Sequence, residues 1–398
     1  MARTPGVNRA LSVTTGIDVL LESGAAPLRG LTVGLITNHT GVNRRLVSTI
    51  DLLREAGVNL RALFGPEHGV RGDAQAGQAV GHTVDPRTGI PVYSLYGETK
   101  RPTPEMLSGL DALVFDIQDA GVRFFTYIYT MAYCLEAAAK HGLKFFVLDR
   151  PNPITGACVE GAPIEPEATS FVGDYGLPFR YGLTMGELAR YVNETRGWGA
   201  DLEVVAMRGW RRSLWFDETG LPWVMPSPNF PTLETATVYP GTVLFEGTNV
   251  SEGRGTTRPF EIIGAPWIDA ARTVAAASEN LADAGVEGAL LREAHFVPTQ
   301  SKHRGEECHG FQIHVLDRNR FEPVRAGIVL LKTIHDLYPG EFAWRASDRP
   351  LWFIDLLAGT RALRDMIDRG SPLLEVVERM AQGAGAFAKA RERFFVYP

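Results

Sequence analysis

Apolar runs of strand length alternate with segments of helical periodicity through the first half of the chain. The first unit is a strand at 31–37, a helix at 48–56 that stops at Gly57, and a strand at 60–64. A strand, a helix and a strand within about 35 residues have the size of one βαβ unit. The alternation continues to a last expected strand at 202–207. This pattern predicts an α/β fold built on a doubly wound, mostly parallel sheet.

The other elements of this half follow from the same two periodicities. Strands are expected at 90–96, 112–117 and 143–148, and helices at 16–22, 103–110, 126–141 and 184–195. The segment 65–89 lacks periodicity and is rich in Gly, Asp, Gln and His, which predicts a long functional loop.

A change in composition separates the second part of the chain from the first. Four prolines fall within 222–231, and three tryptophans lie between 210 and 223. The elements expected beyond this passage are a helix at 267–284, a strand at 311–316, and helices near 325–337, 350–368 and 373–389. Because 398 residues exceed one ordinary core, we expect two domains. They are residues 1–236 and a smaller α+β domain at 237–398.

Charge and composition exclude several classes of protein. The formal net charge is −6, and no basic run interleaved with aromatic residues occurs, which argues against nucleic-acid binding. No apolar run approaches the roughly twenty residues of a membrane span. Three cysteines at spacings that match no zinc motif indicate neither a disulfide framework nor a structural metal. The N-terminus lacks the apolar stretch of a signal peptide, so the sequence as it stands predicts a cytoplasmic location.

Polar side chains follow four of the expected strands. In open α/β sheets, ligands bind beyond the carboxyl ends of the strands, so we expect these side chains to share one site. They are Asn38, His39, Glu67, His68, Asp116, Gln118, Asp119, Arg123, Asp149, Arg150 and Asn152. The alternative is that some are helix caps or ion pairs between loops, and it is strongest for Asp116 and Asp149.

The turn after the 60–64 strand holds a carboxylate beside an imidazole. Gly65 and Pro66 restrict the backbone on one side, and Gly69 frees it on the other. A charged pair on so constrained a turn favours acid–base chemistry, with Glu67 as the first candidate and His68 beside it. No G-x-G-x-x-G, P-loop, G-x-S-x-G or H-E-x-x-H motif occurs. No cofactor and no metal are therefore expected.

A second polar loop, at 245–261, opens the second domain. It holds three carboxylates, two arginines and an asparagine among three glycines. If this loop packs against the strand ends of the first domain, the site lies in the cleft between the two domains. Amides and carboxylates beside an aromatic wall suit a hydroxyl-rich sugar. The polar candidates are Gln118, Asp119, Asn152, Asn229, Asn249 and Glu252. The aromatic candidates, for which core packing is the alternative, are Trp210, Trp215, Trp223, Tyr127 and Tyr129.

A series of motifs along nearly the whole chain resembles one known family. GPEHG, FDIQDAGVRFFTYIYT, DRPNP, EG-x-P, PSPN, FEGTN-x-SEGRGT and GAPW, in this order, resemble the NamZ (YbbC-like) family of exo-β-N-acetylmuramidases. The resemblance implies a Rossmann-like N-terminal domain, a smaller C-terminal domain and an active site in the cleft between them. It also implies release of N-acetylmuramic acid from the non-reducing ends of peptidoglycan fragments. By analogy with the family, the alternative location is periplasmic or secreted.

The resemblance matches Glu67 to the family's catalytic carboxylate. We expect Glu67 to act as general acid, with His68 orienting it or contacting the substrate. The partner of Glu67 is open: it is the substrate's own acetamido group or one of Asp116, Asp119, Glu160, Glu246 and Glu252. The lactyl carboxylate of muramic acid calls for a cation, for which the candidates are Arg123, Arg150 and Arg254. The rival hypotheses are a non-catalytic muramyl-sugar binding protein and a thiol hydrolase using Cys308.

Overall fold

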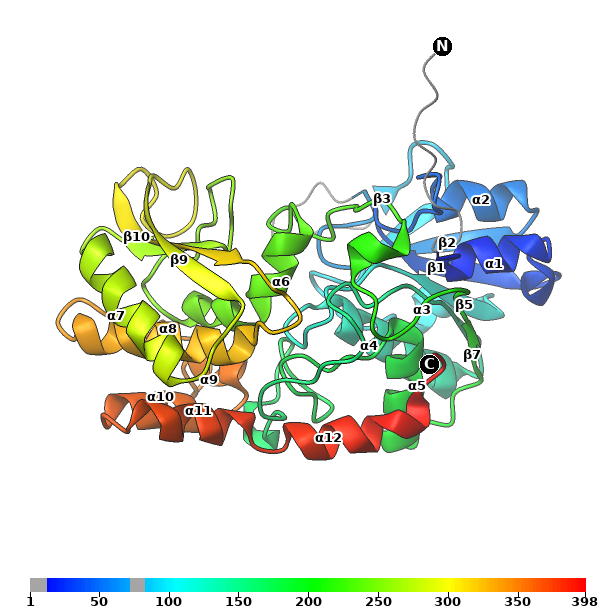
Figure 1. Ribbon diagram of the computed structural model, residues 1–398. Helices are drawn as coiled ribbons and strands as arrows, with labels where there is room; N and C mark the ends of the chain where they lie inside the picture. The colour runs from blue at the N-terminus through cyan, green and yellow to red at the C-terminus, as the bar shows by residue number, and fades with distance from the viewer. Residues whose placement is uncertain (1–12, 72–82) are drawn as a thin grey trace, which may run out of the picture.

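Seven strands form one sheet in the N-terminal half of the chain (Figure 1). The computed structural model describes residues 13–71 and 83–398, and the strand order across this sheet is β3-β4-β2-β1-β5-β6-β7. The strands are β1 (Thr32–Thr37), β2 (Asn59–Gly65), β3 (Thr83–Val84), β4 (Pro91–Ser94), β5 (Ala112–Asp116), β6 (Lys144–Leu148) and β7 (Leu202–Val205). Every neighbouring pair is parallel except β3 with β4. The predicted doubly wound, mostly parallel sheet is confirmed.

The strand order reverses at β1, which has β2 and β4 to one side and β5, β6 and β7 to the other. Ligands bind at such a switch point in open α/β sheets, beyond the carboxyl ends of the strands. The short strand β3 lies within the segment 65–89 that the sequence predicts as a loop. Residues 72–82 of that predicted loop lie outside the described residues.

Helices cover both faces of this sheet. The N-terminal half contains α1 (Gly16–Glu22), α2 (Thr49–Glu55), α3 (Pro104–Leu107), α4 (Tyr127–His141) and α5 (Met185–Thr195). Val33 and Leu35 of β1 pack into the core beneath α1 and α2, whereas Ile36 packs into the core shared with α4 and α5. Strands buried on both faces need apolar residues at consecutive positions, which is why they appear as unbroken apolar runs in the sequence.

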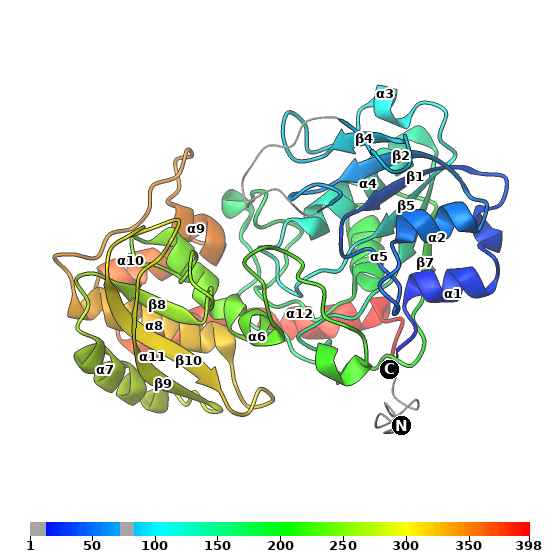
Figure 2. The same cartoon turned by 90° about the horizontal axis from the view of Figure 1, so that it is seen from above.

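The C-terminal half has its own three-stranded antiparallel sheet, in the order β8-β10-β9 (Figure 2). Its elements are α6 (Leu233–Thr242), β8 (Ile262–Ala265), α7 (Ala270–Asp283), β9 (Ala289–Phe296), β10 (Cys308–Val315), α8 (Pro323–Leu337), α9 (Phe353–Ala358), α10 (Ala362–Asp368), α11 (Leu373–Ala381) and α12 (Ala384–Ala390). Helix α7 packs against β9 and β10, and α8 packs against α6 and α7. The predicted smaller second domain is confirmed.

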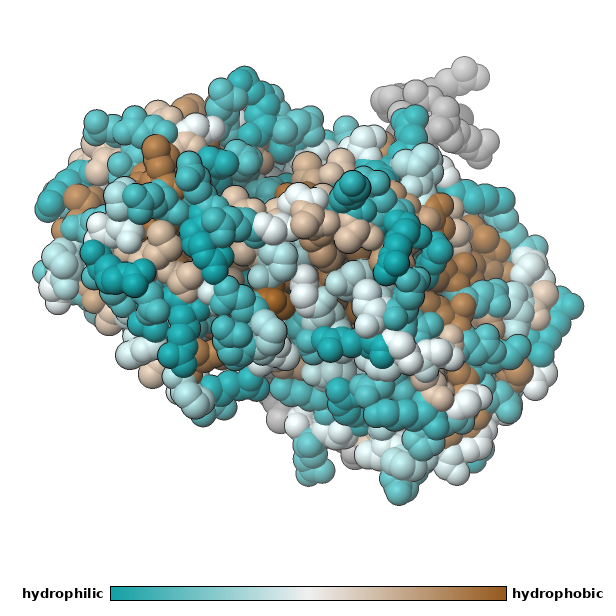
Figure 3. Space-filling view, turned by 90° about the horizontal axis from the view of Figure 1, so that it is seen from below, coloured by the Kyte–Doolittle hydropathy of each residue, from teal (hydrophilic) through white to brown (hydrophobic). Residues whose placement is uncertain are grey.

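Short 3₁₀ helices connect several of these elements. They are η2 (Ala26–Leu28), η3 (Pro166–Ala168), η4 (Phe216–Thr219), η5 (Val243–Gly247) and η6 (Arg391–Phe394). Within the described residues, no helix is long and apolar enough to cross a membrane. The face seen in Figure 3 carries many hydrophilic residues with hydrophobic areas between them.

Two predicted helices are each broken at a glycine. The helix expected at 350–368 is two helices, α9 and α10, and the break lies at Gly359, whose φ is 73°. The helix expected at 373–389 is likewise α11 and α12, separated at Gly383 with φ of 85°. The left-handed conformation that glycine permits ends a helix.

Strands β8 and β9 and helix α6 were not predicted; α6 contains Pro240, which is atypical of a helix interior.

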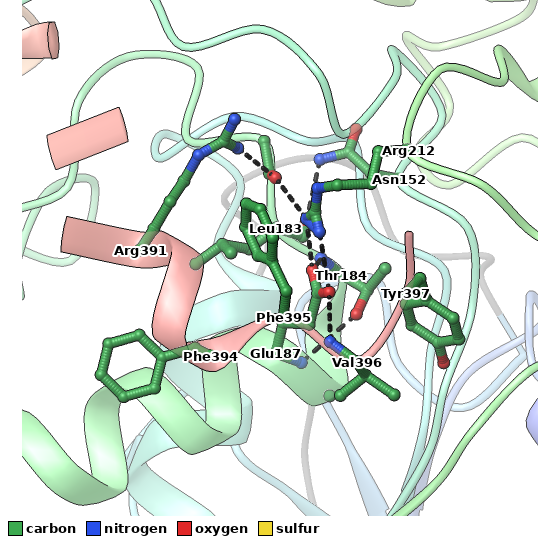
Figure 4. Close-up of polar contacts among 12 residues, drawn as sticks. Asn152, Leu183, Thr184, Glu187, Arg212, Arg391, Phe394, Phe395, Val396 and Tyr397 are labelled. Carbon is green, nitrogen blue, oxygen red and sulfur yellow. Dashed lines mark hydrogen bonds and ion pairs between the residues drawn. The ribbon is translucent and has the colours of Figure 1, made fainter. Parts of the chain in front are cut away.

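The C-terminal tail, residues 384–398, returns to the N-terminal half and packs there (Figure 4). The Arg391 guanidinium donates to the carbonyl oxygen of Tyr181 at 2.9 Å and to that of Ala157 at 3.1 Å. The backbone N–H of Val396 donates to the Glu187 carboxylate at 2.9 Å. The predicted boundary at 236/237 stays a prediction, and the tail beyond it belongs spatially with the first sheet.

We expect Tyr397→Phe to lower the free energy of unfolding by about 1–3 kcal/mol. The Tyr397 hydroxyl donates to Asp149 Oδ2 at 2.7 Å and accepts from the backbone N–H of Met207 at 2.9 Å. Both partners are buried, so losing the hydroxyl leaves polar groups unsatisfied. Calorimetric melting measures the effect. The control is Tyr133→Phe, because no hydrogen bond of the Tyr133 hydroxyl occurs among the described residues. Equal melting of both variants contradicts the prediction.

Candidate active site

A cavity of about 530 Å³ lies between the two halves of the chain. The N-terminal half lines it with Glu67, His68, Tyr96, Lys100, Phe124, Phe125, Thr126, Tyr127, Ser170, Phe171, Val172, Ser227, Asn229 and Phe230. The C-terminal half lines it with Tyr239, Val243, Glu246, Arg254, Phe260, Arg345, Asp348, Arg349, Phe353, Leu356 and Leu357. The cavity therefore combines carboxylates, cations and an apolar wall of phenylalanine and tyrosine rings.

The turn after β2 places Glu67 and His68 on this cavity. The backbone N–H of Gly69 donates to the Pro66 carbonyl oxygen at 2.9 Å, which closes the turn. His68 and Gly69 both take the left-handed conformation, with φ of 71° and 74°. A histidine in this conformation costs free energy, and such residues cluster at functional sites. His68 is buried and Glu67 is half-buried.

Two hydroxyl groups orient the Glu67 carboxylate. Thr126 Oγ1, at the N-cap of α4, donates to Glu67 Oε2 at 2.7 Å. The Tyr96 hydroxyl is the second: burial raises its pKa, and the charge of Glu67 and the hydrogen bond to it raise the pKa further. The N-terminus of α4 also places a positive partial charge near the carboxylate. Glu67 is thus held in one orientation at the edge of the cavity.

We expect Thr126→Val to lower kcat about tenfold and to leave KM nearly unchanged. Valine has the shape of threonine but cannot donate to Glu67, so the carboxyl group loses a bond that positions it. Steady-state kinetics on a β-N-acetylmuraminide, the substrate that the family resemblance leads us to expect, measure the two constants. The matched control is Thr130→Val, one turn further along α4, whose hydroxyl donates to the Thr126 carbonyl oxygen. A rise in KM with constant kcat would instead indicate a binding role for Thr126.

A charged cluster from the second half reaches the cavity that Glu67 lines. Arg254 lies 3.0 Å from Glu246 Oε1 and 3.4 Å from Glu252 Oε1, and Lys302 lies 2.7 Å from Glu252 Oε2. Burial raises the pKa of Glu252, but the charges of Lys302 and Arg254 outweigh burial and hold that pKa below its usual range. Glu252 is therefore an ionised anchor for Arg254. Glu246 and Arg254 reach the cavity lining, and Glu252 lies behind them.

The structure brings together only some of the side chains proposed from the sequence. Those on the cavity lining are Glu67, His68, Tyr127, Asn229, Glu246 and Arg254. Those off the lining are Asn38, His39, Asp116, Gln118, Asp119, Arg123, Arg150, Asn152, Glu160, Asn249 and Glu252. Their roles in the reaction stay predictions, but the contacts of the second group show what each side chain does in the fold.

Asp116 and Arg150 form a buried ion pair. Arg150 Nε lies 2.6 Å from Asp116 Oδ1, and its Nη2 lies 2.9 Å from Oδ2. The Thr49 hydroxyl also donates to Asp116. The pair ties the ends of β5 and β6 together, as expected for the structural alternative weighed for Asp116.

Asp119 and Glu160 are likewise occupied by neighbouring groups. Asp119 accepts from the Tyr181 hydroxyl and from the Gly121 N–H, and burial raises its pKa to about 6. Glu160 lies 2.5 Å from Arg180 Nη1, and burial raises its pKa. Neither carboxylate reaches the cavity that Glu67 lines.

The remaining side chains of this group bond mainly to backbone. Arg123 donates to three carbonyl oxygens, and Asn152 donates to that of Leu183 at 2.9 Å (Figure 4). The others in contact with backbone groups are Asn38, His39, Gln118 and Asn249. These side chains brace loops of the fold, and Asn249 does so within the C-terminal half.

Several lining residues were not singled out from the sequence: Tyr96, Thr126, Lys100, Arg345, Asp348 and Arg349. The basic residues among them, Lys100, Arg345 and Arg349, belong to no motif, so no local signal in the sequence marks them. The predicted aromatic wall also differs. Trp210, Trp215, Trp223 and Tyr129 lie off the lining, where phenylalanines take the predicted place. Tyr129, Trp210 and Trp215 are buried, in agreement with the core-packing alternative.

The thiol alternative has little support at this site. Cys308 lies in β10, off the cavity lining, and burial raises its pKa to about 11. A thiol with so high a pKa is a poor nucleophile near neutral pH. Among the described residues, no group of three or more His, Cys, Asp or Glu could hold a metal ion.

Comparisons with known proteins agree along nearly the whole chain. A family model described as exo-β-N-acetylmuramidase NamZ, N-terminal, matches residues 33–234, and the corresponding C-terminal model matches residues 237–397. Peptidoglycan β-N-acetylmuramidase NamZ of Bacillus subtilis (strain 168) is 51% identical over 386 residues, which are 97% of this chain and 91% of that protein.

Two solved structures of DUF1343 family proteins from Bacteroides fragilis NCTC 9343 share the fold. One has a TM-score of 0.89 and 38% identity, and it covers 98% of this chain and 100% of its own. The other has a TM-score of 0.74 and 29% identity, with 97% and 99% covered. With both family models matched, the chain belongs to the NamZ family of exo-β-N-acetylmuramidases.

Proposed function

We propose that this protein is a glycoside hydrolase that releases N-acetylmuramic acid from the non-reducing ends of peptidoglycan fragments. One observation carries the proposal: in a chain of the NamZ family, the oriented carboxyl group of Glu67 faces a cavity of about 530 Å³. Cavities of this size hold small ligands such as a sugar ring with its substituents. The substrate is a glycan or muropeptide that ends in N-acetylmuramic acid.

In this mechanism Glu67 donates a proton to the glycosidic oxygen as the bond to the anomeric carbon breaks. A water molecule then supplies the hydroxyl group that bonds to the anomeric carbon, and its released proton restores the Glu67 carboxylic acid. Thr126 and Tyr96 hold its carboxyl group in position. His68, next to it on the lining, contacts the substrate. The positive charge that develops on the sugar ring needs a negative partner on the other side of the bond.

We assign Glu246 as that partner. Of the carboxylates considered from the sequence as partners of Glu67, Glu246 alone lies on the cavity lining. Its ion pair with Arg254, at 3.0 Å, fixes its position. In this place Glu246 stabilises the charge on the ring directly, or orients the acetamido group of the substrate for attack on the anomeric carbon.

A defined disaccharide with N-acetylmuramic acid at its non-reducing end tests the proposal. We expect free N-acetylmuramic acid to appear, and NMR of the first-formed anomer to report retention or inversion at the anomeric carbon. The isomeric disaccharide with N-acetylglucosamine at that end should remain intact. Binding of the first disaccharide without any product after long incubation would refute the enzyme and favour the sugar-binding protein.

A further inference from the structure

Three cations reach the cavity without a carboxylate partner. Lys100, Arg345 and Arg349 all line it, and none of them takes part in an ion pair within residues 13–71 and 83–398. Arg254 differs, because Glu246 and Glu252 already neutralise its charge. The cavity therefore offers an anionic ligand positive charge that the protein itself does not compensate.

Lys100 belongs to the N-terminal half, in the segment that follows β4. Its Nζ lies 3.9 Å from the centre of the Phe171 ring, which also lines the cavity. Burial and the nearby charge of Arg349 lower the pKa of Lys100, while Glu67 and Asp348 act in the opposite direction. Lys100 is therefore within electrostatic reach of both Arg349 and the catalytic carboxyl group.

Arg349 belongs to the C-terminal half, in the loop that precedes α9. One guanidinium nitrogen donates to the Thr169 carbonyl oxygen at 3.0 Å, and this bond ties the loop to the N-terminal half. A guanidinium has five N–H donors, so most of them are available to a ligand. Asp348 beside it contributes one negative charge, which the positive charges of Lys100, Arg345 and Arg349 exceed.

The sequence offered Arg150 and Arg123 as other cations for an anionic ligand, and their contacts favour a structural role for both. Arg150 is bound to Asp116, and Arg123 is fully buried and bonded to carbonyl oxygens.

Two like charges brought close together cost free energy, and an anion bound between them relieves that cost. Lys100 and Arg349 come from different halves of the chain, so an anion between them also contacts both walls of the cavity.

We propose that Lys100 and Arg349 together bind the lactyl carboxylate of N-acetylmuramic acid and so select this sugar over N-acetylglucosamine. The inference rests on the proposed function and names the residues that determine its specificity. The two sugars differ only in the lactyl ether, and the carboxylate is its charged group. Carboxylates bind guanidinium and ammonium groups through charge-assisted hydrogen bonds. Lys100 and Arg349 are therefore specificity-determining residues.

The experiment compares three chromogenic substrates: the β-N-acetylmuraminide, its lactyl methyl ester, and the β-N-acetylglucosaminide. In Lys100→Met and Arg349→Gln, kcat/KM for the acid should fall at least about tenfold, and for the ester less than about twofold. Lys100→Arg and Arg349→Lys should recover part of the loss, because the charge is kept. Lys140→Met and Arg393→Gln are matched controls in exposed ion pairs away from the cavity.

Calorimetric binding of free N-acetylmuramic acid and of its methyl ester gives a second readout that needs no turnover. The wild-type protein should prefer the acid, and either variant should remove that preference. Equal losses on acid and ester, or no loss in either variant, would overturn the inference, as would wild-type protein that binds neither ligand. If the wild-type protein cleaves no substrate, the proposed function fails, while the binding preference still decides whether these cations recognise the carboxylate.

Discussion

Glu67→Gln is expected to lower kcat for a muramic-acid-terminated disaccharide by at least about a thousandfold, with the fold intact. Glutamine has the size of glutamate and can still accept the hydrogen bond from Thr126, so the turn after β2 should keep its shape. The amide cannot donate a proton to the glycosidic oxygen as a carboxylic acid does. The loss therefore reports proton transfer. Product release from the disaccharide measures it, and circular dichroism and melting confirm the fold.

The leaving group separates proton donation from other roles of Glu67. A nitrophenolate leaves with little help from an acid, so the Glu67→Gln variant should lose much less activity on the chromogenic muraminide than on the disaccharide. Equal losses would indicate that Glu67 attacks the anomeric carbon instead. Glu55→Gln, at the exposed end of α2, is the control and should act as wild type. Turnover of the disaccharide near the wild-type rate would remove Glu67 from the mechanism.

Arg123→Met is expected to lower the free energy of unfolding by about 3–5 kcal/mol. The side chain is fully buried, and burial lowers its pKa to about 9. Its guanidinium donates to the carbonyl oxygens of Ala162 at 2.8 Å, Leu177 at 3.0 Å and Leu357 at 2.7 Å. Removing the buried charge is favourable by itself, but three buried acceptors lose their donor, and each costs about 1–3 kcal/mol. The cost of the three unsatisfied carbonyl groups therefore exceeds the gain from removing the charge, and the substitution should destabilise the protein.

Denaturant unfolding of the wild-type protein, Arg123→Met and Arg123→Lys measures this effect. Lysine keeps the charge, but its single ammonium group cannot reach all three carbonyl oxygens as the planar guanidinium does. The stability of Arg123→Lys should therefore lie between those of the wild-type protein and Arg123→Met. Arg393→Met, in an ion pair that is more than half exposed, should unfold like the wild type. An Arg123→Met variant that is fully stable but no longer binds N-acetylmuramic acid would restore Arg123 to the substrate-binding role considered from the sequence.

The sheet and its covering helices could be predicted from the sequence because their signals are local. An apolar run at 31–37 or 112–117 marks a strand whichever strands become its neighbours, and β1 and β5 lie there. The capping box at Thr184 and Glu187 likewise marks the start of α5 through contacts within one turn. The breaks at Gly359 and Gly383 were not predicted, because a glycine inside a helical pattern is also compatible with a continuous helix.

The composition of the site was decided by tertiary structure. Asp116 is the last residue of the buried strand β5, and Glu67 follows the strand β2. Because β5 lies next to β6, Asp116 forms a buried ion pair with Arg150. Glu67 instead accepts a hydrogen bond from Thr126 at the start of α4 and lines the cavity.

Lys100 and Arg349 lie far apart in the sequence, and only the approach of the two halves places them on one cavity. The sequence by itself determined the family, the sheet and the turn that holds Glu67, since those depend on contiguous residues. Which charges remain uncompensated depends on neighbours distant in the chain, and only the folded structure reveals them.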